Sequence, residues 1–260
     1  MSIQANLKPG AFCWVELLTR DTAGARKFYG DLMGWRARDV PTGSGATYTM
    51  LMKGERPVAG MMALPEEMQG APPCWMSHVY VTDLDARAER AASLGGRVLN
   101  TGTVEGMGRF AVVADPTGAV LCLWQPNGPM PGPVYQEPGG LAWNELWTAD
   151  PEKAVAFYQG LFGWAGRPHE MAPSYTVFVN DGQGCGGMMP MSEEAARSGA
   201  PPLWMVYLGV EEADASVERA VSLGARVLAP PTDIPKVGRF AVLADPQGAA
   251  FAILEMRFEP

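Results

Sequence analysis

The sequence lacks the features that mark several large classes of protein. Its four cysteines, Cys13, Cys74, Cys122 and Cys185, show no paired spacing, which predicts a reduced protein without disulfides. It has no run of Lys or Arg, and a net charge of −8 argues against binding to nucleic acid or to an anionic membrane. No apolar stretch is long enough to span a bilayer, and residues 1–6 lack the basic and apolar segments of a signal peptide. We therefore expect a cytoplasmic protein.

What the chain does contain is a long internal repeat. Residues 14–21 (WVELLTRD) return as WNELWTAD at 143–150, an offset of 129 residues (143 − 14), and Phe-Tyr and Gly-Trp follow both copies at that offset. An alternating strand, an Asp cap, helical spacing of apolar residues and a Gly stop predict a strand followed by a helix in each copy. A length of 260 residues favours about two domains.

A fainter repeat at an offset of 62 residues, for example Asp21 to Asp83, divides each half again. The sequence thus predicts four βαβββ modules, each of which buries one face against a neighbour. We place the first domain at 1–126 and the second at 141–260, with the Pro- and Gly-rich segment 127–140 as a linker. The four modules are predicted at about 11–64, 74–126, 141–191 and 203–260.

These motifs, together with an Asp-Pro-x-Gly turn before the last strand of each half, at 115–118 and 245–248, resemble the vicinal oxygen chelate superfamily. That group contains glyoxalases, extradiol dioxygenases and bleomycin-resistance proteins. The closest resemblance is to its duplicated two-domain branch, often labelled glyoxalase-like or hydroxylase. The resemblance implies an α+β fold of two tandem domains, each a curved mixed sheet around a concave cup with helices outside.

The resemblance also implies three metal-ligand positions in each domain. Here these positions hold Trp14, Met76 and Cys122 in the first domain, and Trp143, Met205 and Ala252 in the second. Because hard and borderline cations prefer oxygen or nitrogen ligands, we expect no metal, and we expect no other cofactor. Glyoxalase and extradiol activities, which depend on that metal in the superfamily, are therefore disfavoured.

Alternation along the strands predicts which side chains face the cups. Glu16 and Glu145 hold equivalent positions, as do His78 and Tyr207. A carboxylate in an apolar, Trp-rich cup should have a raised pKa unless it is paired, and with a histidine it can serve general acid–base catalysis. Equally, Glu16 could bind His78 or backbone amides, and Glu145 could bind Tyr207, in a purely structural role. The remaining cup-lining candidates are Trp14, Met76, Cys122, Trp124, Trp143, Trp147 and Met205.

Three functions remain open. We favour a small-molecule binder that sequesters an aromatic or polyketide-like metabolite or drug, as a resistance protein does. The alternatives are a metal-free enzyme, hydroxylase-, lyase- or isomerase-like, using Glu16 and His78 on a carbonyl or polyketide substrate, and an interaction protein whose cups are filled by their own side chains. Since the second half has Tyr207 at the position of His78 and Ala252 at that of Cys122, we expect the first cup to be the active one. A monomer with internally paired domains and a homodimer both fit.

Outside the cups, the same alternation turns Trp75 and Trp204 towards the helices. The repeated Arg109 and Arg239, each following a Gly, should form structural salt bridges.

Overall fold

The computed structural model describes residues 7–41, 47–65, 68, 70–129, 132–169, 172–197 and 199–257. Two sequence predictions fall partly or wholly outside the described residues: the lack of a signal peptide in segment 1–6, and linker residues 130 and 131.

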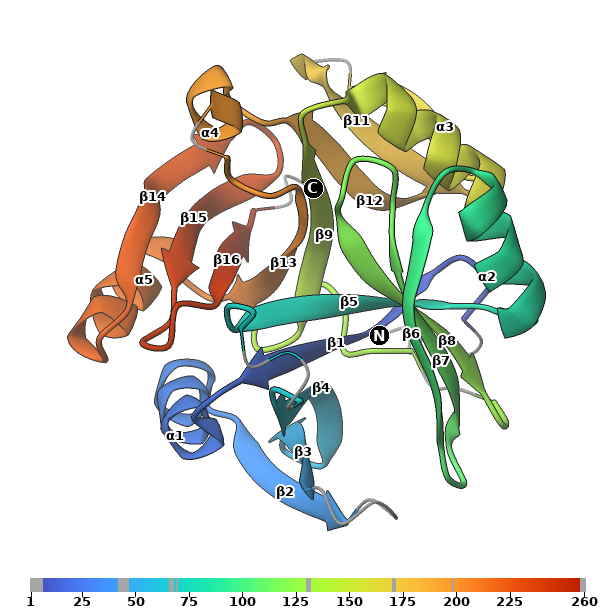
Figure 1. The fold of residues 1–260 in the computed structure, drawn as a ribbon. Helices are drawn as coiled ribbons and strands as arrows, with labels where there is room; N and C mark the ends of the chain where they lie inside the picture. Colours follow the sequence, from blue (N-terminus) through green and yellow to red (C-terminus); the bar gives the residue numbers. More distant parts are fainter. Residues whose placement is uncertain are drawn as a thin grey trace. The chain divides into compact units, whose positions relative to one another are not determined.

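The strands form two eight-stranded sheets (Figure 1). The first has the order β2-β3-β4-β1-β5-β8-β7-β6, and the second repeats it as β10-β11-β12-β9-β13-β16-β15-β14. The strands of the first sheet are β1 (Phe12–Thr19), β2 (Arg36–Pro41), β3 (Thr47–Lys53), β4 (Arg56–Ala63), β5 (Cys74–Tyr80), β6 (Arg97–Val104), β7 (Gly108–Ala114) and β8 (Val120–Pro126). Those of the second are β9 (Leu141–Thr148), β10 (Ala165–His169), β11 (Ala172–Asn180), β12 (Gln183–Pro190), β13 (Leu203–Val210), β14 (Arg226–Ile234), β15 (Gly238–Ala244) and β16 (Ala250–Met256).

The helices follow the first strand of each module, as the repeat predicts. They are α1 (Thr22–Met33), α2 (Leu84–Ser93), α3 (Pro151–Phe162) and α5 (Ala213–Ser222), and a short α4 (Glu193–Arg197) precedes the fourth module. In each module the first and last strands pair in parallel and the other pairs are antiparallel, so both sheets are mixed. The predicted α+β fold of four βαβββ modules in two tandem domains is confirmed.

The helix ends follow the sequence signals closely. Asp21 accepts the backbone N–H of Gly24 at 2.8 Å, and α1 ends where Gly34 adopts a left-handed φ of 69°. Asp150 accepts that of Lys153 at 3.0 Å at the start of α3. Because α1 and α3 follow their strands directly, these caps fix where each module turns from strand to helix.

The chain divides into two compact units that do not follow its sequence halves. The middle-module unit comprises Met1–Cys13, Ser77–Gly132 and Trp143–Met205, and the end-module unit comprises Trp14–Met76, Pro133–Ala142 and Val206–Pro260. Each unit has its own hydrophobic core. The cup predicted for each domain would draw on modules of both units, so it stays a prediction, as do the domain boundaries.

Each core contains a buried hydrogen-bond chain that joins three repeated motifs. In the middle-module unit the Trp204 indole donates to Tyr158 Oη at 2.8 Å, and that hydroxyl donates to Asp115 Oδ2 at 2.9 Å. The other oxygen of Asp115 accepts backbone N–H groups of its own Asp-Pro-x-Gly turn. The end-module unit repeats the chain with Trp75, Tyr29 and Asp245. This confirms that Trp75 and Trp204 point towards the helices, because Tyr29 lies on α1 and Tyr158 on α3.

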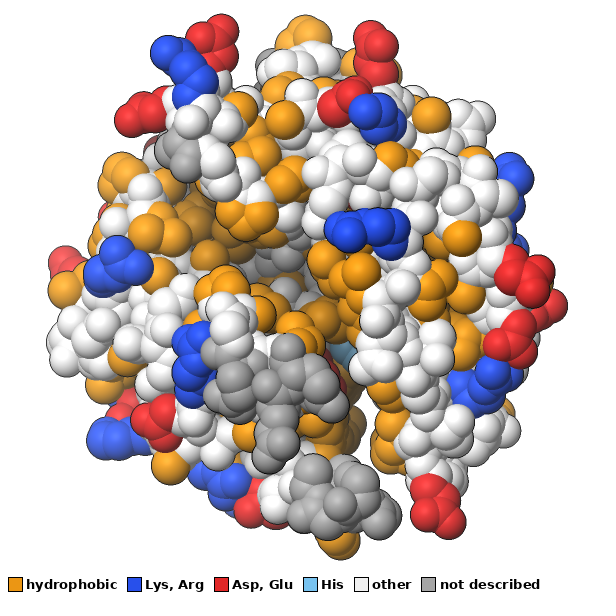
Figure 2. Space-filling model, in the orientation of Figure 1, with side chains coloured by type: hydrophobic (Ala, Val, Ile, Leu, Met, Phe, Trp, Pro, Cys, Tyr) orange, Lys and Arg blue, Asp and Glu red, His pale blue; other side chains and the backbone are white. Residues whose placement is uncertain are grey.

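The surface carries mixed charge. Arg109 pairs with Asp85 at 2.7 Å and Arg239 with Asp214 at 2.7 Å, so the predicted salt bridges are confirmed. Basic and acidic side chains are interspersed over the face shown in Figure 2, and the described Lys and Arg residues form no continuous patch there. Among the described residues, none of the helices is both long and apolar enough to cross a membrane.

Candidate functional site

Glu16, the first predicted catalytic residue, belongs to a hydrogen-bonded chain of three side chains. Trp14 and Glu16 are two residues apart on β1, so they share one face of the strand. The Trp14 indole donates to Tyr48 Oη at 2.8 Å, and the Tyr48 hydroxyl in turn hydrogen-bonds the Glu16 carboxylate. All three belong to the end-module unit. We call this the Trp14–Tyr48–Glu16 chain.

Gly60 makes that chain geometrically possible. β4 lies between β3, which carries Tyr48, and β1, which carries Glu16, and Gly60 on β4 is the register partner of Glu16. A Cβ atom at Gly60 would lie 1.8 Å from Tyr48 Oη and 2.8 Å from the Trp14 indole nitrogen. The absent side chain thus leaves room for the tyrosine to reach across a whole strand.

The third module repeats the arrangement. Trp143 donates to Tyr175 Oη at 2.9 Å, and Gly187 on β12 is the register partner of Glu145. A Cβ atom at Gly187 would again lie 1.8 Å from the tyrosine oxygen. These four residues lie together in the middle-module unit. The Trp, Tyr, Gly and Glu positions therefore form one structural motif that occurs twice in the chain.

The two copies differ at one position beside the glutamate. In the second copy the Trp147 indole donates to Glu145 Oε1 at 2.7 Å. The equivalent residue of the first copy is Leu18, whose side chain has no donor. Glu145 is buried, whereas Glu16 is part-buried.

The electrostatic setting of Glu16 is that of a proton-exchanging group. Burial raises its pKa to about 7, and the hydrogen bond from Tyr48 opposes that rise. Cys74 feels the Glu16 charge, but burial is the main reason that its pKa lies at about 11. The thiol is therefore neutral at pH 7 and adds no charge beside the carboxyl.

The second predicted catalytic residue, His78, lies on β5 in the middle-module unit. Burial lowers its pKa to about 4, so the imidazole is neutral at pH 7. Its Nε2 atom is buried and has no hydrogen-bond partner among the described residues. Its register partner on β8 is Cys122, whose thiol donates to the Leu123 carbonyl at 3.4 Å. A buried imidazole nitrogen without a partner is unusual, because such groups are normally satisfied.

The structure brings some of the predicted residues together and leaves other pairings open. Glu16 joins Trp14, and Glu145 joins Trp147. Glu16 and His78 belong to different compact units, as do Glu145 and Tyr207, so both predicted pairs stay predictions. Of the others, Met76, Cys122, Met205 and Tyr207 are buried, and Trp14, Trp124, Trp143 and Trp147 are part-buried.

Sequence reasoning missed Tyr48 and Tyr175 altogether. Their repeat offset is 127 residues (175 − 48), two short of that of the opening strands, because the loop before them differs in length. Gly60 and Gly187 repeat at the same offset, 127 (187 − 60). The sequence did contain a signal for this contact: a Tyr and a Gly, on adjacent strands, repeat with the same offset.

The chemistry of the donor set does not fit a divalent metal. The six positions implied by the resemblance hold no carboxylate and no imidazole. Within the described ranges, no three His, Cys, Asp or Glu side chains are grouped so that they could hold a metal ion. We therefore derive no chemistry through a metal.

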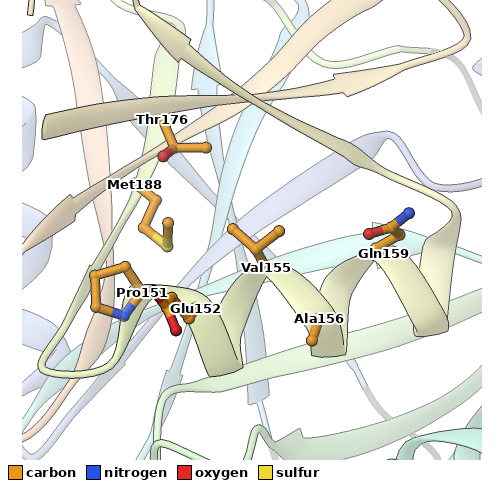
Figure 3. A pocket seen from close by; sticks show the side chains of 7 residues that line it. All are labelled: Pro151, Glu152, Val155, Ala156, Gln159, Thr176 and Met188. Carbon is orange, nitrogen blue, oxygen red and sulfur yellow. The ribbon is translucent and has the colours of Figure 1, made fainter. Parts of the chain in front are cut away.

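Two cavities are lined by other residues. The larger, of about 360 Å³, is an open depression beside α3, and Figure 3 shows Val155 projecting from that helix towards Met188 and Thr176. In the first copy Arg26 stands at the place of Val155 and donates to Asp39 at 2.6 Å. The smaller cavity, of about 60 Å³, is lined by Tyr80, Arg87 and their neighbours. Neither is lined by Glu16, by His78 or by any of the cup-lining candidates named from the sequence.

Comparison with known proteins gives matches along almost the whole chain. The profile of the "Glyoxalase-like domain" family matches residues 14–124 and again 144–254. "Putative glyoxylase CFP32" of Mycobacterium bovis is 38% identical over 260 residues and covers 98% of both chains. "Anthracycline biosynthesis protein DauV" of Streptomyces sp. strain C5 is 35% identical, over 96% of this chain and 94% of its own. The Mn(II)-bound glyoxalase from Novosphingobium aromaticivorans superposes with a TM-score of 0.64 at 12% identity, over 96% of this chain and 83% of that one, which is a likeness of fold.

Proposed function

Because the chain belongs to the glyoxalase-like domain family, with one copy in each half, we propose that it binds a small aromatic or polyketide-like molecule without a divalent metal. The observation that carries the proposal is the set of side chains at the implied metal positions. Trp14, Met76 and Cys122 in the first copy offer an aromatic face, a thioether and a thiol in place of oxygen and imidazole ligands. Such side chains suit contact with a flat apolar ligand.

The anchoring of two tryptophans supports this proposal. The indole N–H groups of Trp14 and Trp143 are each held by a tyrosine hydroxyl. An aromatic ring whose polar edge is already satisfied presents its face with little remaining freedom, so less conformational entropy is lost when a ligand stacks on it. Both rings are part-buried, so they are not sealed inside a core.

The relatives support the ligand class. DauV is named for anthracycline biosynthesis, and anthracyclines are fused-ring aromatic polyketides. The other relative is named "Putative glyoxylase CFP32". An aromatic polyketide agrees with the stacking side chains at the implied metal positions, whereas the resemblance links glyoxalase chemistry to a metal for which this chain offers no matching ligands.

A second function, metal-free acid–base catalysis on a carbonyl-bearing ligand, is favoured by one observation. The Glu16 pKa of about 7 lets the carboxyl both give and take a proton near neutral pH, as a general acid and base must. His78 is neutral at that pH and can donate or accept a hydrogen bond without carrying charge. Under this alternative Glu16 and His78 keep the acid and base roles predicted for them.

The proposal is tested by binding of hydroxymethyl anthraquinone, a planar probe that does not ionise at neutral pH. We expect it to quench tryptophan fluorescence and to raise the melting temperature. Trp14→Ala should weaken binding by about fivefold, because a stacked aromatic contact contributes on the order of 1 kcal/mol. Trp14→Phe, which keeps a ring but loses the indole N–H, should retain most of the affinity.

Two further variants serve as controls. Trp143→Ala reports on the second copy, and Leu99→Ala changes an exposed residue of β6 that should not affect binding. Equal affinity in the native protein and in Trp14→Ala and Trp143→Ala, or no binding at all, would refute the proposed ligand class.

A further inference from the structure

We propose that Tyr48 is a positioning residue that sets Glu16 for proton exchange with a bound carbonyl or phenol oxygen, whereas the second copy holds Glu145 as a fixed acceptor that serves binding alone. The inference rests on the acid–base alternative of the proposed function. It assigns different tasks to two copies that share the same Trp, Tyr and Gly positions.

The first step is geometric. Tyr48 reaches Glu16 across β4, and only a residue without a side chain at position 60 leaves space for its hydroxyl. Trp14 donates to the same tyrosine oxygen, which fixes the hydroxyl and leaves its proton directed at the carboxylate. If Tyr48 only filled space, it would need neither the glycine at position 60 nor the hydrogen bond that Trp14 donates to its oxygen.

The second step is the difference between the copies. Trp147 donates to Glu145 at 2.7 Å, and Leu18 offers no such donor to Glu16. This hydrogen bond occupies one oxygen of Glu145 and fixes the orientation of its carboxyl. Glu16 lacks that donor. Its hydrogen bond with Tyr48 is therefore the contact that orients the carboxyl and stabilises its charged form. Tyr48 hydrogen-bonds Glu16, and the thiol of Cys74, which interacts electrostatically with Glu16, is neutral.

The third step is the chemistry that this arrangement permits. When Glu16 is protonated, its proton moves to the ligand oxygen as a new O–H bond forms and the carboxyl O–H bond breaks. The carboxylate left behind keeps the hydrogen bond from Tyr48, which retains its own proton throughout. The reverse transfer restores the acid, so no oxidant or further reactant is required. The ligand oxygen gains one proton without a change of oxidation state: a phenolate becomes a phenol, and a carbonyl oxygen becomes the hydroxyl of the protonated carbonyl.

The decisive experiment follows the Glu16 carboxyl directly. Protein labelled with ¹³C at the glutamate carboxyl carbon is titrated by NMR, and the Glu16 signal is assigned by its loss in Glu16→Gln. We expect a midpoint near 7 in the native protein. In Tyr48→Phe the midpoint should rise further, by about half a unit to one unit, because the hydrogen bond that favours the charged form is lost.

Matched variants separate this effect from a general loss of structure. Tyr175→Phe removes the equivalent hydroxyl of the second copy and should leave the Glu16 midpoint unchanged. Gly60→Ala should reproduce the shift of Tyr48→Phe, because its Cβ displaces the tyrosine, and Gly187→Ala should not. A native midpoint near 4.5, or one that is the same in the native protein and in Tyr48→Phe, would overturn the inference.

The same variants connect the inference to ligand binding. With hydroxymethyl anthraquinone as the probe, affinity should fall as pH rises through 7 in the native protein and should be independent of pH in Glu16→Gln. A shifted NMR midpoint with no binding of the probe would leave the Tyr48 contact intact and overturn the proposed ligand class. Binding whose pH dependence persists in Glu16→Gln would overturn proton exchange at Glu16.

Discussion

At the scale of single residues, one glutamate carries most of the functional interest. Glu16 lies on a strand with many apolar residues, and its carboxyl hydrogen-bonds the neutral hydroxyl of Tyr48. Because burial disfavours the charged form and the hydrogen bond from Tyr48 offsets this only in part, the pKa of Glu16 lies at about 7, above its ordinary value of 4.5.

This shift has a consequence for stability. The folded protein holds a proton on Glu16 at pH values where the unfolded chain has released it, so the stabilising contribution is complete below pH 4.5 and is lost as pH rises through 7. Glu16→Gln is neutral at every pH. We therefore expect it to be more stable than the native protein at pH 8 by about 1–2 kcal/mol, less than the full shift because the side chain is part-exposed.

The measurement is urea unfolding of both proteins at pH 4.5 and pH 8. The difference between them should appear at pH 8 and be nearly absent at pH 4.5. A difference that is the same at both pH values would mean that the pKa of Glu16 is the same in the folded and unfolded states.

At the scale of secondary-structure elements, the helix starts show two ways of satisfying the first backbone N–H groups. Asp150 caps α3 from the adjacent position, as sequence signals predict. Helix α5 begins after Glu212, which makes no capping hydrogen bond. Its first N–H, that of Ala213, is accepted instead by Glu255 on β16 at 2.9 Å. A contact between residues 42 positions apart cannot be recognised as a cap from local sequence.

We predict matching effects on stability. Asp150→Ala and Glu255→Ala should each lower the free energy of unfolding by about 1 kcal/mol, because each leaves a helix N–H without its acceptor. Glu212→Ala, the apparent cap of α5, should change it by less than about 0.5 kcal/mol. Chemical denaturation of the three variants checks this. A loss in Glu212→Ala equal to that in Asp150→Ala would contradict this account of how α5 is capped.

Elements with strong sequence signals were predicted well, and those without were missed. Strand β1 and helix α1 follow their alternation, Asp cap and Gly stop almost to the residue. The edge strands β2 (Arg36–Pro41) and β10 (Ala165–His169) were not placed from the sequence, because their residues are largely exposed and polar and carry no apolar alternation. Helix α4 has no buried residue and gave no periodic signal either.

At the scale of the whole molecule, the sequence predicts four modules but cannot say which modules share a core. Its motifs are symmetric, so Tyr29 on α1 could in principle bind the Asp of either Asp-Pro-x-Gly turn. In the structure it binds Asp245, 216 residues away, and the equivalent Tyr158 binds Asp115. Each core therefore takes one module from each half of the chain. Duplication explains why both units are built alike, and the three-dimensional packing decides how they are assembled.

The candidate site shows the same division. The face of β1 that carries Trp14 and Glu16 could be predicted from alternation alone. The partner Tyr48 could not, because it lies two strands away in the sheet and reaches Glu16 only across Gly60. Its role depends on a missing side chain, which a pattern of apolar residues does not reveal.

The proposed lack of a divalent metal rests on the six positions implied by the resemblance, which hold side chains unsuited to a cation in both copies. It is tested most directly by the metal content of protein purified without chelators, followed by calorimetric titration with Mn(II) and Zn(II). We predict well below one equivalent of metal per chain, and no saturable binding that Glu16→Gln or His78→Gln abolishes. One tightly bound divalent ion per chain that is lost in either variant would contradict the claim.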